Sequence, residues 1–168
     1  MEGMIKNMAL RQIREVGDDI LRKKSRPVEV VDERTKQLID DMYETLKASE
    51  DGIGLAAPQV GVLKRVIVID LSEEDSKEIY KLVNPVIVKS KGEQVCREGC
   101  LSVPGVLGDV IRPKEVVVEA LNENGQKIKI KAQDLLAIVL CHEIDHLDGI
   151  LFTDKATELF DNTDEEEG

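Results

Sequence analysis

The most constraining feature of this sequence is a pair of histidines that directly follows an apolar segment near the C-terminal end. Residues 137–141 read Ala-Ile-Val-Leu-Cys, and residues 142–146 read His-Glu-Ile-Asp-His. The chain has two histidines, and both lie in this segment, four positions apart. On an α-helix such positions share one face, so both imidazoles can reach one metal ion. Glu143 lies between them, and this H-E-x-x-H spacing is typical of metal sites in which the glutamate acts as general base.

The same pattern on an exposed acidic helix would have no such meaning. The apolar residues at 137–141 predict that this helix is buried. Burying two histidines and a glutamate is costly unless they have a metal ion or other polar partners. The sequence therefore predicts a metal site on a buried helix.

A catalytic metal site usually has three protein ligands and one open position, so the two histidines need a third ligand. The longer peptidase form of the motif would place a histidine at position 152, which is Phe152. A glutamate from a later helix is not expected, because only residues 147–168 follow and they end in an acidic run. A thiolate is the better candidate. Cys141 is displaced around the helix from His142, which leaves Cys96 and Cys100.

Length and charge limit the class of protein. The 168 residues fit one catalytic domain over 1–168, with 1–8 as an N-terminal extension and 162–168 as an acidic flexible tail. The formal net charge of −11 argues against a nucleic-acid-binding surface, and no apolar run is long enough to span a membrane. Three cysteines without a secretory signal favour a reducing cytoplasm.

The hydrophobic patterns predict an α+β fold, in which antiparallel β-strands pack around a central metal-binding α-helix. Asp32 is expected to cap a helix that runs to about residue 49, and Asp134 to cap the metal-binding helix, with Gly149 as its stop. A last short helix is expected to run to Phe160, and residues 105–109 are expected to form a loop. Asn124 and Gly125 favour a type I′ hairpin turn. Strands are expected at 65–71, 79–83, 86–90, 93–96, 115–121 and 126–132.

Residues 52–61 read Gly-Ile-Gly-Leu-Ala-Ala-Pro-Gln-Val-Gly. Their small side chains allow a ligand or another backbone to approach closely. Gln59 is a lone amide among apolar neighbours, and a buried amide needs hydrogen-bond partners. The composition fits a tight turn between a helix and a strand equally well. It does not fit a phosphate loop, because no Gly-Lys-Ser/Thr follows.

Three segments taken together resemble the signature motifs of peptide deformylases, in the family's order. They are residues 52–59, residues 98–102 (Glu-Gly-Cys-Leu-Ser) and residues 142–146. The resemblance extends from about Ala9 to Asp154. It implies a hydrolase that removes the formyl group from N-formylmethionine at the N-terminus of newly made proteins and releases formate. It also implies a single divalent metal ion, Fe²⁺ in the native enzymes, with Zn²⁺, Ni²⁺ or Co²⁺ as substitutes, held by Cys100, His142 and His146.

The resemblance also implies roles for residues around the metal. Glu143 is expected to take a proton from the attacking water and to deliver it to the leaving amine. The Gln59 side-chain amide and the Leu101 backbone N–H are expected to donate to the oxyanion that develops on the formyl oxygen. Glu98 is expected at the substrate pocket, and Glu98 and Asp145 are candidate acceptors for the second N–H of the metal-bound histidines.

The substrate pocket is expected on the same helix face as the first histidine. Positions three, four and seven residues before it, which are Val139, Ile138 and Leu135, are expected to line an apolar slot for the methionine side chain. Ile53 and Gly54 are expected to pair with the substrate backbone as an added strand.

The expected partners are N-formylmethionyl nascent peptides and, transiently, the ribosome. Neither a membrane nor a sequence-specific nucleic acid is expected. The chain has Leu107 where relatives carry an aromatic residue or arginine, and it lacks the long basic C-terminal helix that some relatives use to dock on the ribosome. A zinc peptidase and a non-catalytic peptide-binding relative are the alternatives. The missing third peptidase ligand argues against the first, and Gln59 and Glu143 argue against the second, because holding a metal requires neither.

Overall fold

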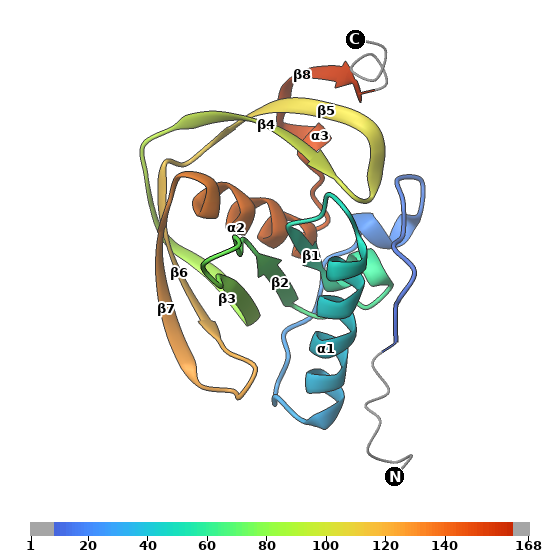
Figure 1. Ribbon diagram of the computed structural model, residues 1–168, viewed down its shortest axis with the longest axis vertical. Helices are drawn as coiled ribbons and strands as arrows, with labels where there is room; N and C mark the ends of the chain where they lie inside the picture. The colour runs from blue at the N-terminus through green and yellow to red at the C-terminus, as the bar shows by residue number, and fades with distance from the viewer. Residues whose placement is uncertain (1–8, 163–168) are drawn as a thin grey trace.

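Two antiparallel sheets lie on opposite sides of one helix, α2, in the computed structural model (Figure 1). The structure describes residues 9–162. The expected extension at 1–8, and the expected tail apart from Asn162, lie outside the described residues. Within the described chain, no helix is both long and apolar enough to cross a membrane.

The larger sheet has five strands in the order β1-β2-β3-β6-β7, and every neighbouring pair is antiparallel. Its inward-facing side chains form a buried cluster with α2, so the helix covers one face of this sheet. The strands are β1 (Gly54–Ala56), β2 (Val66–Asp70), β3 (Ile79–Lys91), β6 (Glu115–Leu121) and β7 (Lys127–Gln133).

The smaller sheet has three antiparallel strands in the order β4-β5-β8. They are β4 (Gln94–Cys100), β5 (Val103–Arg112) and β8 (Ala156–Asp161). Val103 and Val110 of β5 pack in a separate buried cluster with Leu151 and Phe152, which follow α2. The smaller sheet therefore packs on the segment that follows α2 and on Leu21 of the 3₁₀ helix at Asp19–Arg22.

The helical elements are η2 (Asp19–Arg22), α1 (Glu33–Ala48), η3 (Ala57–Val60), α2 (Asp134–Leu147) and α3 (Phe152–Lys155), where η denotes a 3₁₀ helix. The expected helix after Asp32 is confirmed, and the Asp32 side chain accepts a hydrogen bond from the Thr35 N–H at 2.9 Å. Leu38, Ile39, Met42 and Leu46 form its buried face.

The start of α2 differs from the prediction, whereas its end matches. Asp134 is the first helical residue, with a φ of 56°, and Gln133 takes the cap position without a side-chain hydrogen bond. Asp134 instead pairs with Lys114. At the other end Gly149 has a φ of 75°, and its N–H donates to the His146 carbonyl, so the expected glycine stop is confirmed.

The expected break at Asn84-Pro85 was wrong, because β3 continues through it as one strand with a change of register between Val83 and Val86. Asn84 has a φ of 52°, and its side-chain amide exchanges two hydrogen bonds of 2.8 Å with the Val28 backbone. These bonds stabilise a bulge at which regular pairing would fail.

Other differences concern strand extent and turns. Residues 105–109, expected as a loop, lie within β5, and β4 continues beyond residue 96 to Cys100. The last helix ends at Lys155, and Phe160 lies in β8, because residues 156–161 pair with β5. Gly125 has a positive φ but Asn124 does not, so the hairpin turn is not type I′.

Candidate functional site

Cys100, His142 and His146 converge between the two sheets. One potential ligand atom from each side chain lies within 4.8 Å of the other two. Cys100 Sγ is 3.3 Å from His146 Nε2. The two histidines share a face of α2 because they are four residues apart, and both are buried. Cys100 reaches them from the last position of β4, where the register with β5 shifts between Glu98 and Cys100.

The other two cysteines lie elsewhere. Cys96 is at the wall of the pocket that Cys100 also lines, but it lies outside the three-residue cluster. Cys141 is buried in the core beside the larger sheet, where burial raises the pKa of its thiol to about 11. Of the two candidates left by the sequence, the structure therefore brings Cys100 to the histidines.

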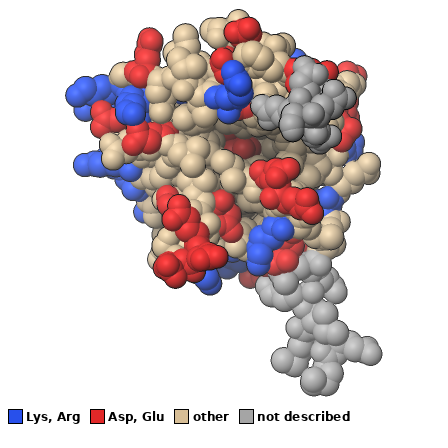
Figure 2. Space-filling model, turned by 45° about the horizontal axis from the view of Figure 1, so that its top comes forward, with Lys and Arg blue, Asp and Glu red and all other residues tan. Residues whose placement is uncertain are grey.

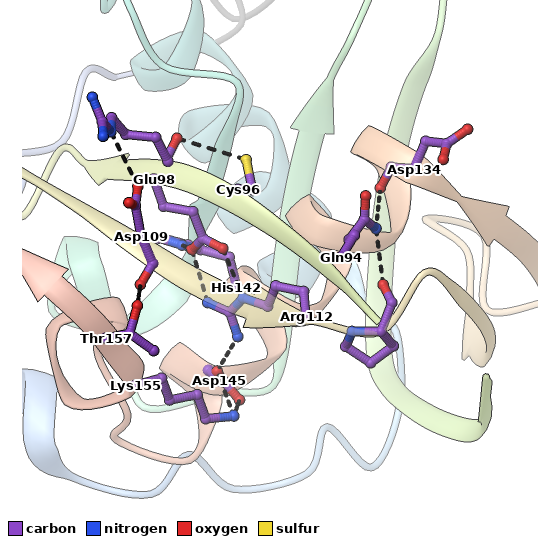
Figure 3. A network of polar contacts seen from close by, with 12 residues as sticks. Gln94, Cys96, Glu98, Asp109, Arg112, Asp134, His142, Asp145, Lys155 and Thr157 are labelled. Atoms are coloured by element: carbon purple, nitrogen blue, oxygen red, sulfur yellow. Dashed lines mark hydrogen bonds and ion pairs between the residues drawn. The ribbon is translucent and has the colours of Figure 1, made fainter. Parts of the chain in front are cut away.

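Glu98 holds the ring of His142. The His142 Nδ1 donates to Glu98 Oε1 at 2.8 Å, which leaves Nε2 directed toward the cluster. Arg112 donates to both oxygens of the same carboxylate, from Nε and from a terminal nitrogen, at 2.8 Å each (Figure 3). All three side chains are buried. Burial acts to raise the pKa of Glu98, but hydrogen bonds from Arg112 and His142 outweigh it and hold that pKa below its ordinary value.

Arg112 continues this network to the surface. Its remaining terminal nitrogen donates to Asp145 at 2.7 Å, and Asp145 also pairs with Lys155 of α3 at 3.0 Å (Figure 3). The two-point contact of Arg112 with Glu98 was not predicted from the sequence and is a finding of the structure. An arginine on the inward face of β5, in phase with Val110, was the available signal, because a buried guanidinium requires carboxylate partners.

The hydrogen bonds also bear on metal binding by His142. Burial acts to lower the pKa of His142, but hydrogen bonds to Cys100 and Glu98 outweigh it and raise that pKa to about 10. For His146, burial and the charge of His142 lower the pKa. A metal ligand must be a neutral imidazole, so binding of a divalent ion here would release a proton.

Glu143 differs from Glu98 and His142, which are hydrogen-bonded to each other. It is buried, and its Oε1 has no hydrogen-bond partner among the described residues. Burial raises the pKa of its carboxyl group to about 7. The carboxylate lies against Gly54 of β1, where an added Cβ would be 2.5 Å from Oε2. Gly54 therefore leaves the room that the Glu143 carboxylate occupies.

Gln59 lies behind the cluster rather than on the pocket wall. Its Oε1 accepts from the Ala56 N–H at 2.9 Å, and its Nε2 donates to Ser102 Oγ at 3.0 Å and lies 3.6 Å from Cys100 Sγ. Ser102 was not singled out from the sequence. A hydroxyl two residues after the cysteine was a weak signal, because only the folded chain shows that it holds the buried amide.

A pocket of about 700 Å³ opens beside the cluster. Figure 2 shows a hollowed face of the molecule with acidic side chains along its edge. Ile53 and Leu135 are half exposed at this pocket, whereas Ile138 and Val139 are buried. The wall includes all of the residues that were expected to bind substrate, which are Ile53, Gly54, Glu98, Leu135, Ile138 and Val139. It also includes Cys100, Leu101, His142 and Glu143.

The donor set fits a divalent metal ion. One sulfur and two imidazole nitrogens suit Fe²⁺, Zn²⁺, Co²⁺ or Ni²⁺, and a site of three protein ligands leaves a position open for substrate. The hydrogen bond from His142 to Glu98 fixes the ring in the manner typical of metal-bound histidines. The unpartnered carboxylate of Glu143 beside the cluster is the group that a bound water would contact.

Comparisons with known proteins agree with this geometry. The family model described as polypeptide deformylase matches residues 10–161. The peptide deformylase of Acetivibrio thermocellus is 59% identical over 159 residues, which cover 95% of this chain and 91% of the relative. A crystal structure of a peptide deformylase from Legionella pneumophila has a TM-score of 0.84 and 47% identity, over 89% of this chain and 87% of that one. The Met-Ala-Ser-bound enzyme from Acinetobacter baumannii has a TM-score of 0.82 and 33% identity, over 88% and 99%.

Proposed function

The chain belongs to the peptide deformylase family, and from that premise we propose that it is a metal-dependent hydrolase of N-formylmethionyl peptides. It removes the formyl group from the first methionine of newly made proteins and releases formate. The observation that carries the proposal is the unpartnered Glu143 carboxylate beside the cluster of Cys100, His142 and His146, at the wall of one pocket.

Cys100, His142 and His146 would hold the metal ion. When bound, a divalent ion lowers the pKa of a water molecule and polarises a carbonyl group. We take Fe²⁺ as the native ion, with Zn²⁺, Ni²⁺ and Co²⁺ as functional substitutes, because a thiolate with two imidazoles accepts all four.

Glu143 carries the proton transfers. Its carboxylate takes a proton from the water whose oxygen attacks the formyl carbon. When the bond between that carbon and the amide nitrogen breaks, Glu143 delivers the proton to the nitrogen, so formate and a free amino terminus leave. A pKa near 7, raised by burial, suits a group that must both accept and return a proton near neutral pH.

The negative charge that develops on the formyl oxygen needs donors. The Leu101 backbone N–H at the pocket wall and the Gln59 side-chain amide are the candidates, and the loss of one such donor typically lowers the rate by about 10²–10³. Ser102 and Ala56 hold the Gln59 amide in place through its two polar atoms. The formyl group is small, so a tight corner at this position would exclude an acetyl group.

The pocket supplies the contacts to the peptide. Leu135, Ile138 and Val139 would surround the methionine side chain with apolar surface. Ile53 and Gly54 lie at β1, which is an outer strand of the five-stranded sheet, so a substrate backbone can pair there as an added strand. The relative from Acinetobacter baumannii has been crystallised with Met-Ala-Ser, which is the product that such a reaction would leave.

The expected cellular context follows from the substrate. Nascent chains place the reaction in the cytoplasm, with the ribosome as a transient partner and residues 1–168 acting as one catalytic domain. A zinc peptidase is not favoured, because the third ligand atom in the cluster is the Cys100 sulfur rather than a histidine or glutamate.

The test is formate release from N-formyl-Met-Ala-Ser by protein prepared without oxygen and loaded with Fe²⁺ or Ni²⁺. An acetyl-Met-Ala-Ser peptide and an unblocked peptide are the controls. We expect formate from the first peptide and no change in the other two. No formate release from metal-loaded protein would contradict the proposal, and cleavage of internal peptide bonds would indicate a peptidase.

A further inference from the structure

The N-terminal strap, defined here as residues 9–16, belongs to neither sheet. It runs along α1 before the chain enters η2 (Figure 1). Terminal segments usually contribute little unless specific contacts hold them. This one is held at its start, where the Ala9 N–H and the Arg11 side chain both contact the buried carboxylate of Asp41 at 3.0 Å. Its far end leads into Leu21, which is buried among residues of β5 and α3.

Between these anchors, two backbone donors of the strap contact the residues that support the oxyanion donors. The Arg14 N–H donates to the Gln59 carbonyl at 2.6 Å, and the Val16 N–H donates to the Ser102 carbonyl at 2.7 Å. Donors two residues apart point to the same side of an extended chain. One edge of the strap therefore contacts the two segments that hold the proposed donors.

These two segments come from different parts of the fold. Gln59 lies in η3, directly after β1 of the five-stranded sheet, whereas Ser102 lies between β4 and β5 of the three-stranded sheet. The Gln59 amide and the Leu101 N–H, one residue before Ser102, are therefore supported by different sheets. Inside the site, the hydrogen bond from Gln59 Nε2 to Ser102 Oγ links them, and the strap links them again from behind.

We propose that the N-terminal strap sets the separation between the Gln59 amide and the Leu101 N–H, and that the backbone N–H groups of Arg14 and Val16 position these two donors for the reaction. The inference rests on the proposed function. Stabilisation of an oxyanion depends on donors fixed in advance, and a displacement of about 1 Å can lower a rate by up to about 10²-fold. Loss of the strap bonds should therefore lower kcat while the apolar pocket still binds the peptide.

Val16→Pro tests this directly. Residues 15–18 form a turn in which the Asp18 N–H donates to the Glu15 carbonyl and Gly17 has a φ of 104°. Proline is favoured at the second position of such a turn, so its φ suits the local backbone. The substitution removes the N–H that reaches Ser102 and places the ring Cδ against that carbonyl, which forces the two segments apart at this point. Val16→Ala is the matched control, because it keeps the N–H and shortens a side chain that is 54% exposed.

We expect Val16→Pro to lower kcat for N-formyl-Met-Ala-Ser by roughly tenfold or more, with KM changed less than about twofold. Val16→Ala should match the wild type. The visible absorption spectrum of the Co²⁺-loaded protein should be the same in all three, since the metal ligands are not affected. In a Gln59→Ala background, the effect of Val16→Pro should shrink, because the donor that it positions is gone.

A second variant tests whether a lower kcat comes from the strap contacts rather than from a general loss of folding. Arg11→Ala removes one of the two contacts that anchor the strap on Asp41, far from the turn, and should lower kcat in the same manner but less. Wild-type kcat in Val16→Pro, a change confined to KM, or an equal change in Val16→Ala would overturn the inference. The wild-type assay separates this result from the proposed function, because absence of formate from wild-type protein contradicts only the latter.

Discussion

The two glutamates beside the histidines are both buried, but their surroundings differ. Glu98 accepts hydrogen bonds from Arg112 and His142, and its pKa is held low. Glu143 has an oxygen without a partner in the described chain, and burial raises its pKa to about 7. The comparison teaches that burial alone does not decide what a carboxylate does. Glu98 is suited to hold a ring in place, whereas Glu143 is free to exchange a proton.

The largest expected effect concerns catalysis. Glu143→Gln keeps the size of the side chain but cannot accept the proton of the attacking water. We expect kcat for N-formyl-Met-Ala-Ser to fall by about 10²–10⁴-fold, with the metal content unchanged. Formate release and metal analysis on the same preparation measure both. Retention of most of the activity would show that Glu143 is not the general base.

Substitution of Glu98 is expected to lower both the stability of the protein and its affinity for metal. Glu98→Gln removes the charge that pairs with Arg112 and leaves that guanidinium with Asp145 as its remaining carboxylate. We expect the free energy of unfolding to fall by about 3 kcal/mol near neutral pH, measured by urea denaturation. Since the folded-state pKa of Glu98 is depressed, this contribution should disappear as the pH falls through that pKa. Metal affinity should also fall by about 10–100-fold.

Glu143→Gln should have the reverse effect on stability. A carboxyl group whose pKa is raised on folding costs stability once the unfolded chain ionises. In metal-free protein the variant should therefore be as stable as the wild type below pH 4.5, the ordinary pKa of a glutamate. Its stability relative to the wild type should increase as the pH rises to about 7. Above that pH the gain should be constant, at up to about 3 kcal/mol. Urea unfolding at pH 4 and pH 8 with a chelator present would measure it. Equal stability of variant and wild type at pH 8 would contradict this expectation and would mean that the ionised Glu143 carboxylate is stabilised by hydrogen bonds in the folded protein.

The smallest effect is expected at the outer end of the Glu98 network. Lys155 pairs with Asp145, and its side chain is 44% exposed. Lys155→Met should change the free energy of unfolding by less than about 1 kcal/mol and leave kcat unchanged. A loss comparable to that of Glu98→Gln would show that the whole network acts as one unit, from the surface to His142.

Local features of the site could be predicted from sequence, and distant contacts could not. The shared face of His142 and His146 follows from helical spacing alone, as does the approach of Leu135, Ile138 and Val139 to the pocket. A choice between Cys96 and Cys100 on spacing alone was not possible. It depends on where β4 meets α2 and on a register shift that no local pattern encodes.

The same limit explains the errors in the fold. Asn84 and Pro85 have the composition of a strand break, but the Val28 backbone satisfies the Asn84 amide and the strand continues. Residues 156–161 form β8 rather than a helix, because β5 offers them a strand to pair with. Antiparallel sheets and few helices were expected and are confirmed, whereas the metal at the central helix remains a prediction.

The spacing of the site along the chain has a consequence for folding. Gln59 and Cys100 are 41 positions apart, and Cys100 and His146 are 46 positions apart. No fragment shorter than residues 59–146, about half of the chain, contains these residues, so the site can form only after its distant segments have met. A ligand that requires all of these residues binds only the native state, and it should raise the unfolding temperature in proportion to the logarithm of its concentration. Binding at the site would then measure completed folding as well as readiness for catalysis.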